Sequence, residues 1–142
     1  MAAPEMISRL MVARTAAHMA HLQTTSFAQH KALDGFYNDI VDLLDSFAET
    51  YQGIFGLIKK YPEVTMPTGN ADKWIDSLRT WLKKDRTSSC RGETALENIH
   101  DELQALCAST VYKLRYLDNP ALKEAGESED EEERELMGMN KW

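Results

Sequence analysis

The sequence has few of the features that mark secreted, membrane-spanning or nucleic-acid-binding proteins. It has two cysteines, Cys90 and Cys107, in 142 residues, and their spacing fits neither a CxxC pair nor a zinc finger, so we expect no disulfide framework. No stretch approaches the ~20 apolar residues of a membrane span. The net charge of −7 argues against binding to DNA or anionic membranes, because both attract basic surfaces. The N-terminus lacks the apolar core of a signal peptide, so a cytoplasmic protein is expected.

Proline is also rare, and its four positions (4, 62, 67 and 120) leave long periodic segments uninterrupted. Apolar residues recur with a helical period over four segments, and nothing alternates with the period of a strand. The sequence therefore predicts an all-α protein without a sheet. The expected helices cover residues 5–23, about 26–60, about 71–86 and about 93–118. Ser26 and Gln29 have capping-box spacing at the start of the second helix.

The expected helices have clear apolar faces. Trp74 and Trp81 are seven apart and are expected in the core, as is Cys107. Cys90, in a Ser-rich break, is expected to be exposed, and His100 to be structural or exposed. The residues expected on the apolar faces of the first two helices are Ile7, Leu10, Met11, His18, Leu22, Phe27, Leu33, Phe36, Ile40, Val41, Leu44, Phe47, Ala48, Tyr51 and Phe55.

The composition changes sharply near residue 123, where the sequence becomes KEAGESEDEEERELMGMNKW. An acidic run this dense repels itself and cannot bury surface. We therefore expect a folded domain over residues 1–122 and an acidic, disordered tail over residues 123–142. The tail is a candidate binding site for a protein partner.

Residue types that bind metals lie along the expected second helix. His30, Asp34, Asp45 and Glu49 fall within a wedge of roughly 100° around the helix, because each residue turns the chain by about 100°. The two pairs are nevertheless about 16 Å apart along the axis, so one chain cannot place both on a single metal ion.

Two copies of the helix can share a metal ion if they pack antiparallel around a twofold axis between Asp34 and Asp45. The His–Asp pair of one chain then faces the Asp–Glu pair of its partner, as a self-complementary interface requires. If the first helix folds back at Thr24–Thr25, His18 approaches His30 and completes the site. His21 also has ligand spacing to His18, but we expect it to face solvent or a partner. Imidazole with carboxylate suits iron, and manganese or zinc as alternatives.

The run H-x11-H-x3-D-G-F-x8-D-x3-E resembles the signature of the Dps family of mini-ferritins. The matching residues are His18, His30, Asp34, Gly35, Phe36, Asp45, Ala48 and Glu49, with Phe27 matching an aromatic three residues before the second His. The chain also resembles, more loosely, small uncharacterised ferritin-like proteins of tailed phages. The resemblance implies a ferritin-like antiparallel four-helix bundle, with non-haem iron bound between twofold-related subunits by two His of one chain and an Asp–Glu pair of the other.

The sequence departs from the family pattern at several places. Met19 stands where the family has Trp, Thr24–Ser26 replace a Gly-containing turn, and Thr50 replaces an Arg. The Lys-rich arm that gives many members DNA binding is absent, so DNA binding is not expected. A homodimer through the second helix is expected, and a dodecameric shell is what the resemblance implies beyond it.

Two functions follow from these observations. The first is oxidation of ferrous iron by peroxide or oxygen, with storage or detoxification of the product. The alternative is a non-catalytic ferritin-like interaction or structural protein, acting through its dimer surface or acidic tail. For a phage-encoded protein, a place in the virion is the alternative to the cytoplasm.

Overall fold

The computed structural model describes residues 2–117, which form four helices. These helices are α1 (Ala2–Gln23), α2 (Phe27–Phe55), α3 (Ala71–Cys90) and α4 (Thr94–Tyr116). The described part contains no strand, so the all-α prediction is confirmed there. The predicted acidic tail over 123–142 lies outside the described residues, as does the predicted domain boundary at residue 122.

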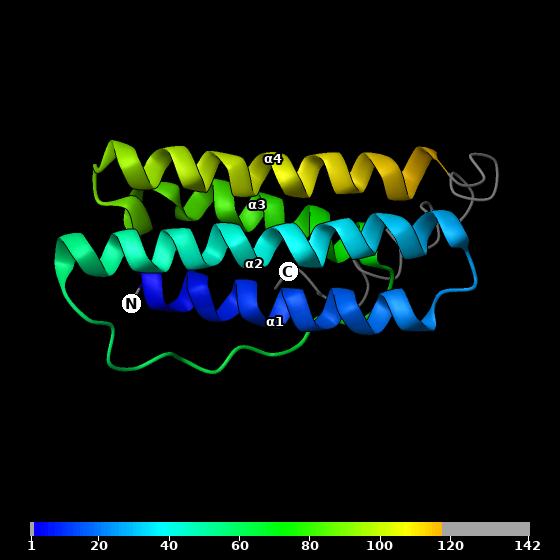
Figure 1. The fold of residues 1–142 in the computed structure, drawn as a ribbon, viewed down its shortest axis with the longest axis horizontal. Helices are drawn as coiled ribbons and strands as arrows, with labels where there is room; N and C mark the ends of the chain where they lie inside the picture. Colours follow the sequence, from blue (N-terminus) through cyan, green and yellow to red (C-terminus); the bar gives the residue numbers. More distant parts are fainter. Residues whose placement is uncertain (1, 118–142) are drawn as a thin grey trace.

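The helices form an antiparallel four-helix bundle (Figure 1). Short turns join α1 to α2 and α3 to α4, and residues 56–70 cross from one end of the bundle to the other. Helix α2 packs on α1 and α4, and α3 also packs on α1 and α4. Every neighbouring pair is therefore antiparallel, while α1 and α4 lie on a diagonal. Two hairpins joined by one long crossover give the topology of ferritin-like bundles.

Helix α2 begins at the predicted cap and ends earlier than predicted. The backbone N–H of Gln29 donates to Ser26 Oγ over 3.2 Å. The return contact is made by Thr24, whose hydroxyl bonds Gln29 Oε1 at 2.9 Å and accepts from the N–H of Ser26 at 3.1 Å. The helix stops at Phe55 rather than near residue 60, because Gly56 adopts a φ of 98°, which favours glycine and breaks the helix.

Helix α3 continues through the segment predicted to be a break. It runs to Cys90, and the turn is confined to Arg91, at a left-handed φ of 54°, and Gly92, at 79°. This extension places Cys90 inside the bundle, where it is fully buried. The prediction of an exposed Cys90 was therefore wrong, whereas Cys107 lies in the core as predicted.

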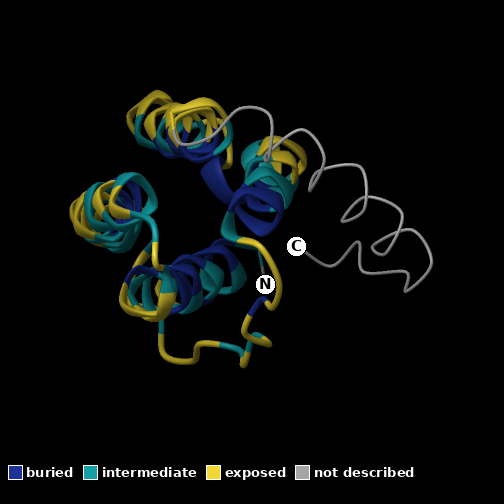
Figure 2. Cartoon of the chain, turned by 90° about the vertical axis from the view of Figure 1, so that its right-hand side faces the viewer, coloured by how far each residue is buried: buried dark blue, intermediate teal, exposed yellow. Residues whose placement is uncertain are grey.

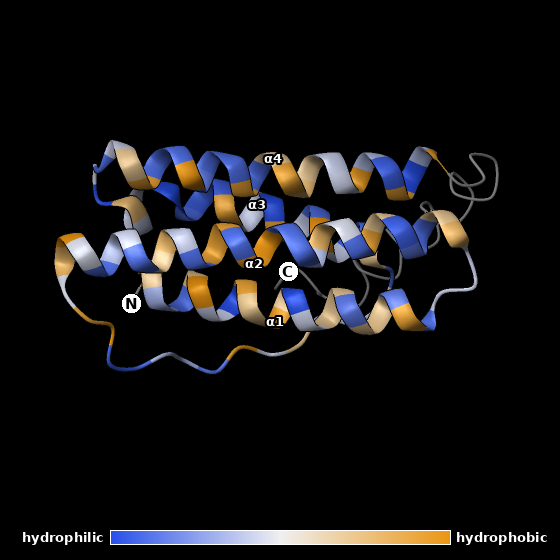
Figure 3. Ribbon diagram, in the orientation of Figure 1, coloured by the Kyte–Doolittle hydropathy of each residue, from blue (hydrophilic) through white to orange (hydrophobic). Residues whose placement is uncertain are grey.

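The core is formed by the apolar faces of all four helices, and the buried sides of the helices face the bundle axis (Figure 2). Apolar and hydrophilic residues alternate along the helices (Figure 3). Trp74 is buried and Trp81 packs against the core, as predicted. Three residues expected on apolar faces are instead exposed, namely Met11 at 46%, Leu22 at 71% and Phe27 at 75%. They follow the helical period but point away from the bundle, because no described element covers the outer side of the α1–α2 hairpin.

Candidate functional site

Three of the four histidines gather where α1 and α2 lie side by side, close to the Thr24–Ser26 turn. The rings of His21 and His30 stack with centroids 3.6 Å apart, and His18 lies 6.0 Å from His21. The turn therefore brings His18 and His30 to the same end of the hairpin, as predicted, but His21 is the residue that contacts His30. His21 is buried, so the prediction that it faces solvent or a partner was wrong.

His21 and His30 hold each other through reciprocal bonds to the backbone. His21 Nδ1 lies 2.7 Å from the carbonyl oxygen of His30, and His30 Nδ1 lies 2.9 Å from the carbonyl oxygen of His21. A carbonyl oxygen only accepts, so both Nδ1 atoms donate, and Nε2 is the nitrogen of each ring that is left to bind a metal ion. Metal-binding imidazoles are commonly oriented in this way, with the second nitrogen donating to a backbone carbonyl.

Tyr37 connects this histidine pair to Asp34. Its ring stacks on His18 with centroids 4.3 Å apart and meets His21 edge-on at 5.3 Å. Its hydroxyl donates to Asp34 Oδ1 over 3.0 Å, and Asn38 donates to the same oxygen over 3.2 Å. Burial, followed by the bond to Asp34, raises the pKa of Tyr37. These contacts orient the Asp34 carboxylate and keep it on the same side of α2 as His30.

Asp45 and Glu49 are separated from the histidines. Both are exposed on α2, and the rise of a helix places Asp45 about 16 Å along the axis from Asp34. Among residues 2–117 of one chain, no three His, Cys, Asp or Glu side chains are arranged to hold a metal ion. A single chain therefore presents an oriented donor set at one end of the helix and two exposed carboxylates farther along it.

Four large apolar side chains are exposed on the α1–α2 hairpin. We call them the hairpin patch, and they are Met11, Met19, Leu22 and Phe27. Met11 and Met19 are both 46% exposed, and Leu22 and Phe27 flank the turn. The same hairpin is acidic along α2, where Asp39 and Asp42 are exposed. Exposed apolar groups beside charged ones are typical of a protein-binding surface.

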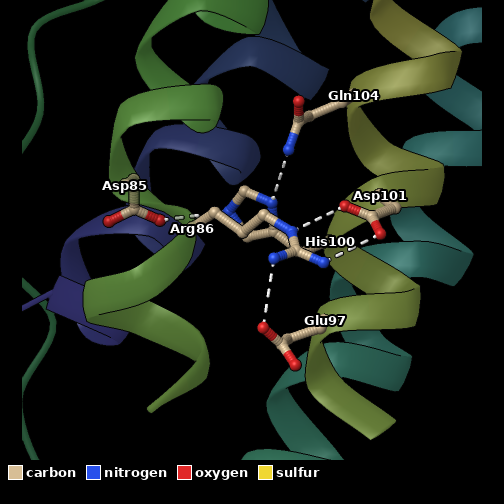
Figure 4. A network of polar contacts seen from close by, with 6 residues as sticks. All are labelled: Asp85, Arg86, Glu97, His100, Asp101 and Gln104. Atoms are coloured by element: carbon tan, nitrogen blue, oxygen red, sulfur yellow. Dashed lines mark hydrogen bonds and ion pairs between the residues drawn. The ribbon is translucent and has the colours of Figure 1, made fainter. Parts of the chain in front are cut away.

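A second polar cluster lies between α3 and α4 and involves the fourth histidine (Figure 4). His100 is fully buried. Its Nε2 donates to Asp85 Oδ2 over 3.3 Å, and its Nδ1 accepts from the Gln104 amide over 3.1 Å. The Ser89 hydroxyl donates to the same Asp85 oxygen at 2.6 Å, so the imidazole is not placed to activate this serine. We interpret the cluster as a structural link between α3 and α4.

An ion-pair network lies on the outer side of the same two helices (Figure 4). Arg86 contacts Asp101 through two nitrogens, at 2.7 and 3.0 Å, and Glu97 at 3.1 Å. The bond from Arg86 lowers the pKa of Asp101. The network links α3 to α4 through three partly exposed charged side chains.

Comparison with known proteins identifies the family. The model of a family of unknown function, DUF5856, matches residues 21–114. The chain belongs to this family. It is also 30% identical over 118 residues to an uncharacterized 14.6 kDa protein of the mobD–ri intergenic region of Enterobacteria phage T4. That match covers 79% of this chain and 87% of the phage protein. No solved structure matches the chain.

His21 and Tyr37 were not among the predicted site residues, although the sequence carries a signal for each. His21 forms HxxH with His18, and Tyr37 lies three residues after Asp34 and seven after His30, on the same side of the helix.

No helix of the described part is long and apolar enough to cross a membrane.

Proposed function

We propose that the protein is a Dps-like iron-binding protein that oxidises ferrous iron with peroxide or oxygen at a site shared by two chains. In this proposal His18, His30 and Asp34 of one chain meet the partner's Asp45 and the partner's Glu49. One observation carries the proposal. The α1–α2 hairpin orients imidazoles and a carboxylate at one end of α2, and two more carboxylates lie exposed farther along it.

The surface around these residues supports the dimer. Association through the hairpin would bury the hairpin patch, whose side chains are largely exposed in a single chain, and burial of apolar area favours association. The same contact would bring the carboxylates of the two α2 helices together, which is unfavourable in the absence of a cation. We therefore expect divalent cations to strengthen the dimer.

The side chains have distinct roles in this proposal. The carboxylates of Asp34, Asp45 and Glu49 are hard oxygen donors that favour the ferric product, and the imidazole Nε2 atoms favour the ferrous substrate. The electron lost by each ferrous ion passes to peroxide or oxygen. His21 holds His30 in place, and Tyr37 holds Asp34. Manganese and zinc suit the same donors and are the alternatives to iron.

Oxidised iron would be stored or detoxified if the dimers assemble into a closed shell, for which a dodecamer is the arrangement suggested by the family resemblance. The relative from phage T4 supports a phage-related setting. We therefore place the protein in the cytoplasm of an infected cell, with the virion as the alternative.

The test replaces the two carboxylates that are remote from the histidines. Asp45→Asn with Glu49→Gln should abolish rapid oxidation of added ferrous iron, followed by absorbance of the ferric product after peroxide addition. Asp42→Asn is the matched control, because Asp42 is exposed on the same helix and lies outside the proposed site. Unchanged oxidation in the double variant would refute the proposal.

The second candidate is a non-catalytic ferritin-like interaction or structural protein, and the hairpin patch favours it. Four exposed apolar side chains on one hairpin suit protein binding whether or not a metal is present. The acidic tail is its other candidate surface. Elemental analysis after anaerobic ferrous loading separates the two functions. A folded dimer without iron supports this candidate, whereas one to two irons per chain support the first.

A further inference from the structure

Helix α4 exposes a face that carries almost no charge. Between the buried Leu103 and the end of the helix, residues spaced by three or four positions are exposed, and this spacing places them on one side. We call this the α4 face, and it consists of Ala105, Ala108, Ser109, Tyr112 and Tyr116. By contrast, the exposed residues of α3 include Lys83 and Lys84, as expected for a solvated helix surface.

The two tyrosines are the largest groups on this face. Tyr112 is 52% exposed and Tyr116 is 54% exposed, and their ring centroids lie 6.1 Å apart. Tyrosine is enriched at protein interfaces. Ala105 and Ala108 have small side chains, so a second helix can approach closely beside the tyrosines. The α4 face therefore combines a flat centre with two large groups that can pack over it.

The charges beside the α4 face are self-complementary. Glu102 and Lys113 are both exposed and lie within about 20° of each other around the helix. They are equally far, about 8 Å along the axis, from a midpoint beside Ala108. A twofold axis through that midpoint reverses the helix direction but leaves each flank of the face on the same side in both copies. It therefore brings Glu102 of each chain opposite the partner's Lys113.

Two further charges of the described part lie near this face, and both are paired within the chain. Asp101 is bound by Arg86, and Arg115 contacts Asp72 at 3.2 Å and Asp76 at 3.8 Å. Among residues 2–117, a second copy would therefore meet the complementary Glu102–Lys113 set at this face.

We propose that α4 packs antiparallel against α4 of a second copy of this chain, around a twofold axis beside Ala108. In this arrangement Tyr112 lies over the partner's Ala105. The contact uses residues of α4, whereas the proposed iron site uses residues of α1 and α2. A chain that uses both surfaces can join dimers into larger assemblies. The proposal does not depend on metal binding.

Disulfide trapping tests the register. Ala108→Cys places the new thiols beside the axis, where oxidation should give a cross-linked dimer on denaturing gels. Asn98→Cys is the matched control, because Asn98 is exposed on the same helix but would lie about 28 Å from its copy. The native cysteines are buried, so they should not contribute. Cross-linking at Asn98→Cys equal to that at Ala108→Cys, or none at either position, would overturn the proposal.

A charge swap tests the ion pairs. Glu102→Lys or Lys113→Glu alone should weaken self-association roughly tenfold, because two exposed pairs become two like-charge contacts. The double swap should restore association. Sedimentation equilibrium at low salt would measure this in a Phe27→Glu background, which should weaken the proposed hairpin contact. A double swap as weak as the single variants, or no self-association in this background, would contradict the α4 contact without bearing on the iron site.

Discussion

The buried His100–Asp85 pair should contribute strongly to stability, and His100→Ala tests this. His100 is fully buried, and its two ring nitrogens bond Asp85 and Gln104. The replacement removes both hydrogen bonds, leaves a cavity where the ring was, and leaves the buried Asp85 with the Ser89 hydroxyl as its remaining partner in the cluster. Asp85→Asn is milder, because the amide keeps the size of the carboxylate and can still accept a hydrogen bond.

The expected magnitude follows from these losses. Each hydrogen bond contributes about 1 kcal/mol, and removal of one member of a buried pair costs about 3–5 kcal/mol once the unpaired partner and the cavity are included. The free energy of unfolding of a native protein is about 5–15 kcal/mol, so His100→Ala should remove a large part of it. Asp85→Asn should cost about 1–2 kcal/mol.

Urea denaturation followed by circular dichroism measures the free energy of unfolding of each variant. Asp101→Asn is the control, because it lies next to His100 but belongs to the exposed network with Arg86, where pairs contribute about 1 kcal/mol or less. If His100→Ala costs no more than this control, the buried cluster is not the link between α3 and α4 that its geometry indicates.

Three other predictions follow from the structure. Burial raises the pKa of Cys90 to about 11 and of Cys107 to about 12, so both thiols should resist a thiol reagent at pH 8 until urea unfolds the protein; rapid labelling of the native chain would contradict their burial. The lowered pKa of Asp101 means that its pair with Arg86 stabilises the fold above about pH 4, and that this stabilisation is lost as pH falls through the lowered pKa. Asp101→Asn should therefore make the free energy of unfolding less sensitive to acid, as measured by urea denaturation over a pH series. An unchanged pH profile would refute this. Phe27→Glu should weaken self-association in sedimentation experiments without lowering Tm, because this ring is exposed in the single chain; a large fall in Tm would show that the ring is part of the core.

The helical period of the apolar residues was sufficient to predict the four helices and most of their apolar faces. Phe36, Leu44 and Phe47 are buried as predicted, because their spacing places them on one side of α2. The end of α2 was predicted too late, since the apolar pattern continues through Leu57 and Ile58 beyond Gly56. Local composition does not reveal that this glycine adopts a positive φ, which depends on the path of the crossover.

Burial of individual side chains was harder to predict, because it depends on which elements cover a face. Met11 and Phe27 follow the apolar period but lie on the uncovered side of the hairpin. His100 is buried through contacts with Asp85, fifteen residues earlier on another helix. His21 was missed for the same reason, since its partner His30 lies across a turn. The placement of His18 and His30 at one end of the hairpin was predictable, but the contacts among the histidines required the packing of α1 on α2.

A subunit-mixing experiment tests the central claim, a metal site shared between two chains, most directly. One variant carries His30→Ala with Asp34→Asn, and the other carries Asp45→Asn with Glu49→Gln. Each variant alone should lack rapid ferrous oxidation. After unfolding and refolding together, random pairing makes half of the dimers mixed, each with one intact site, so the activity should return to about a quarter of that of the unmodified protein. If mixed dimers form but no activity returns, the five residues do not form a shared site.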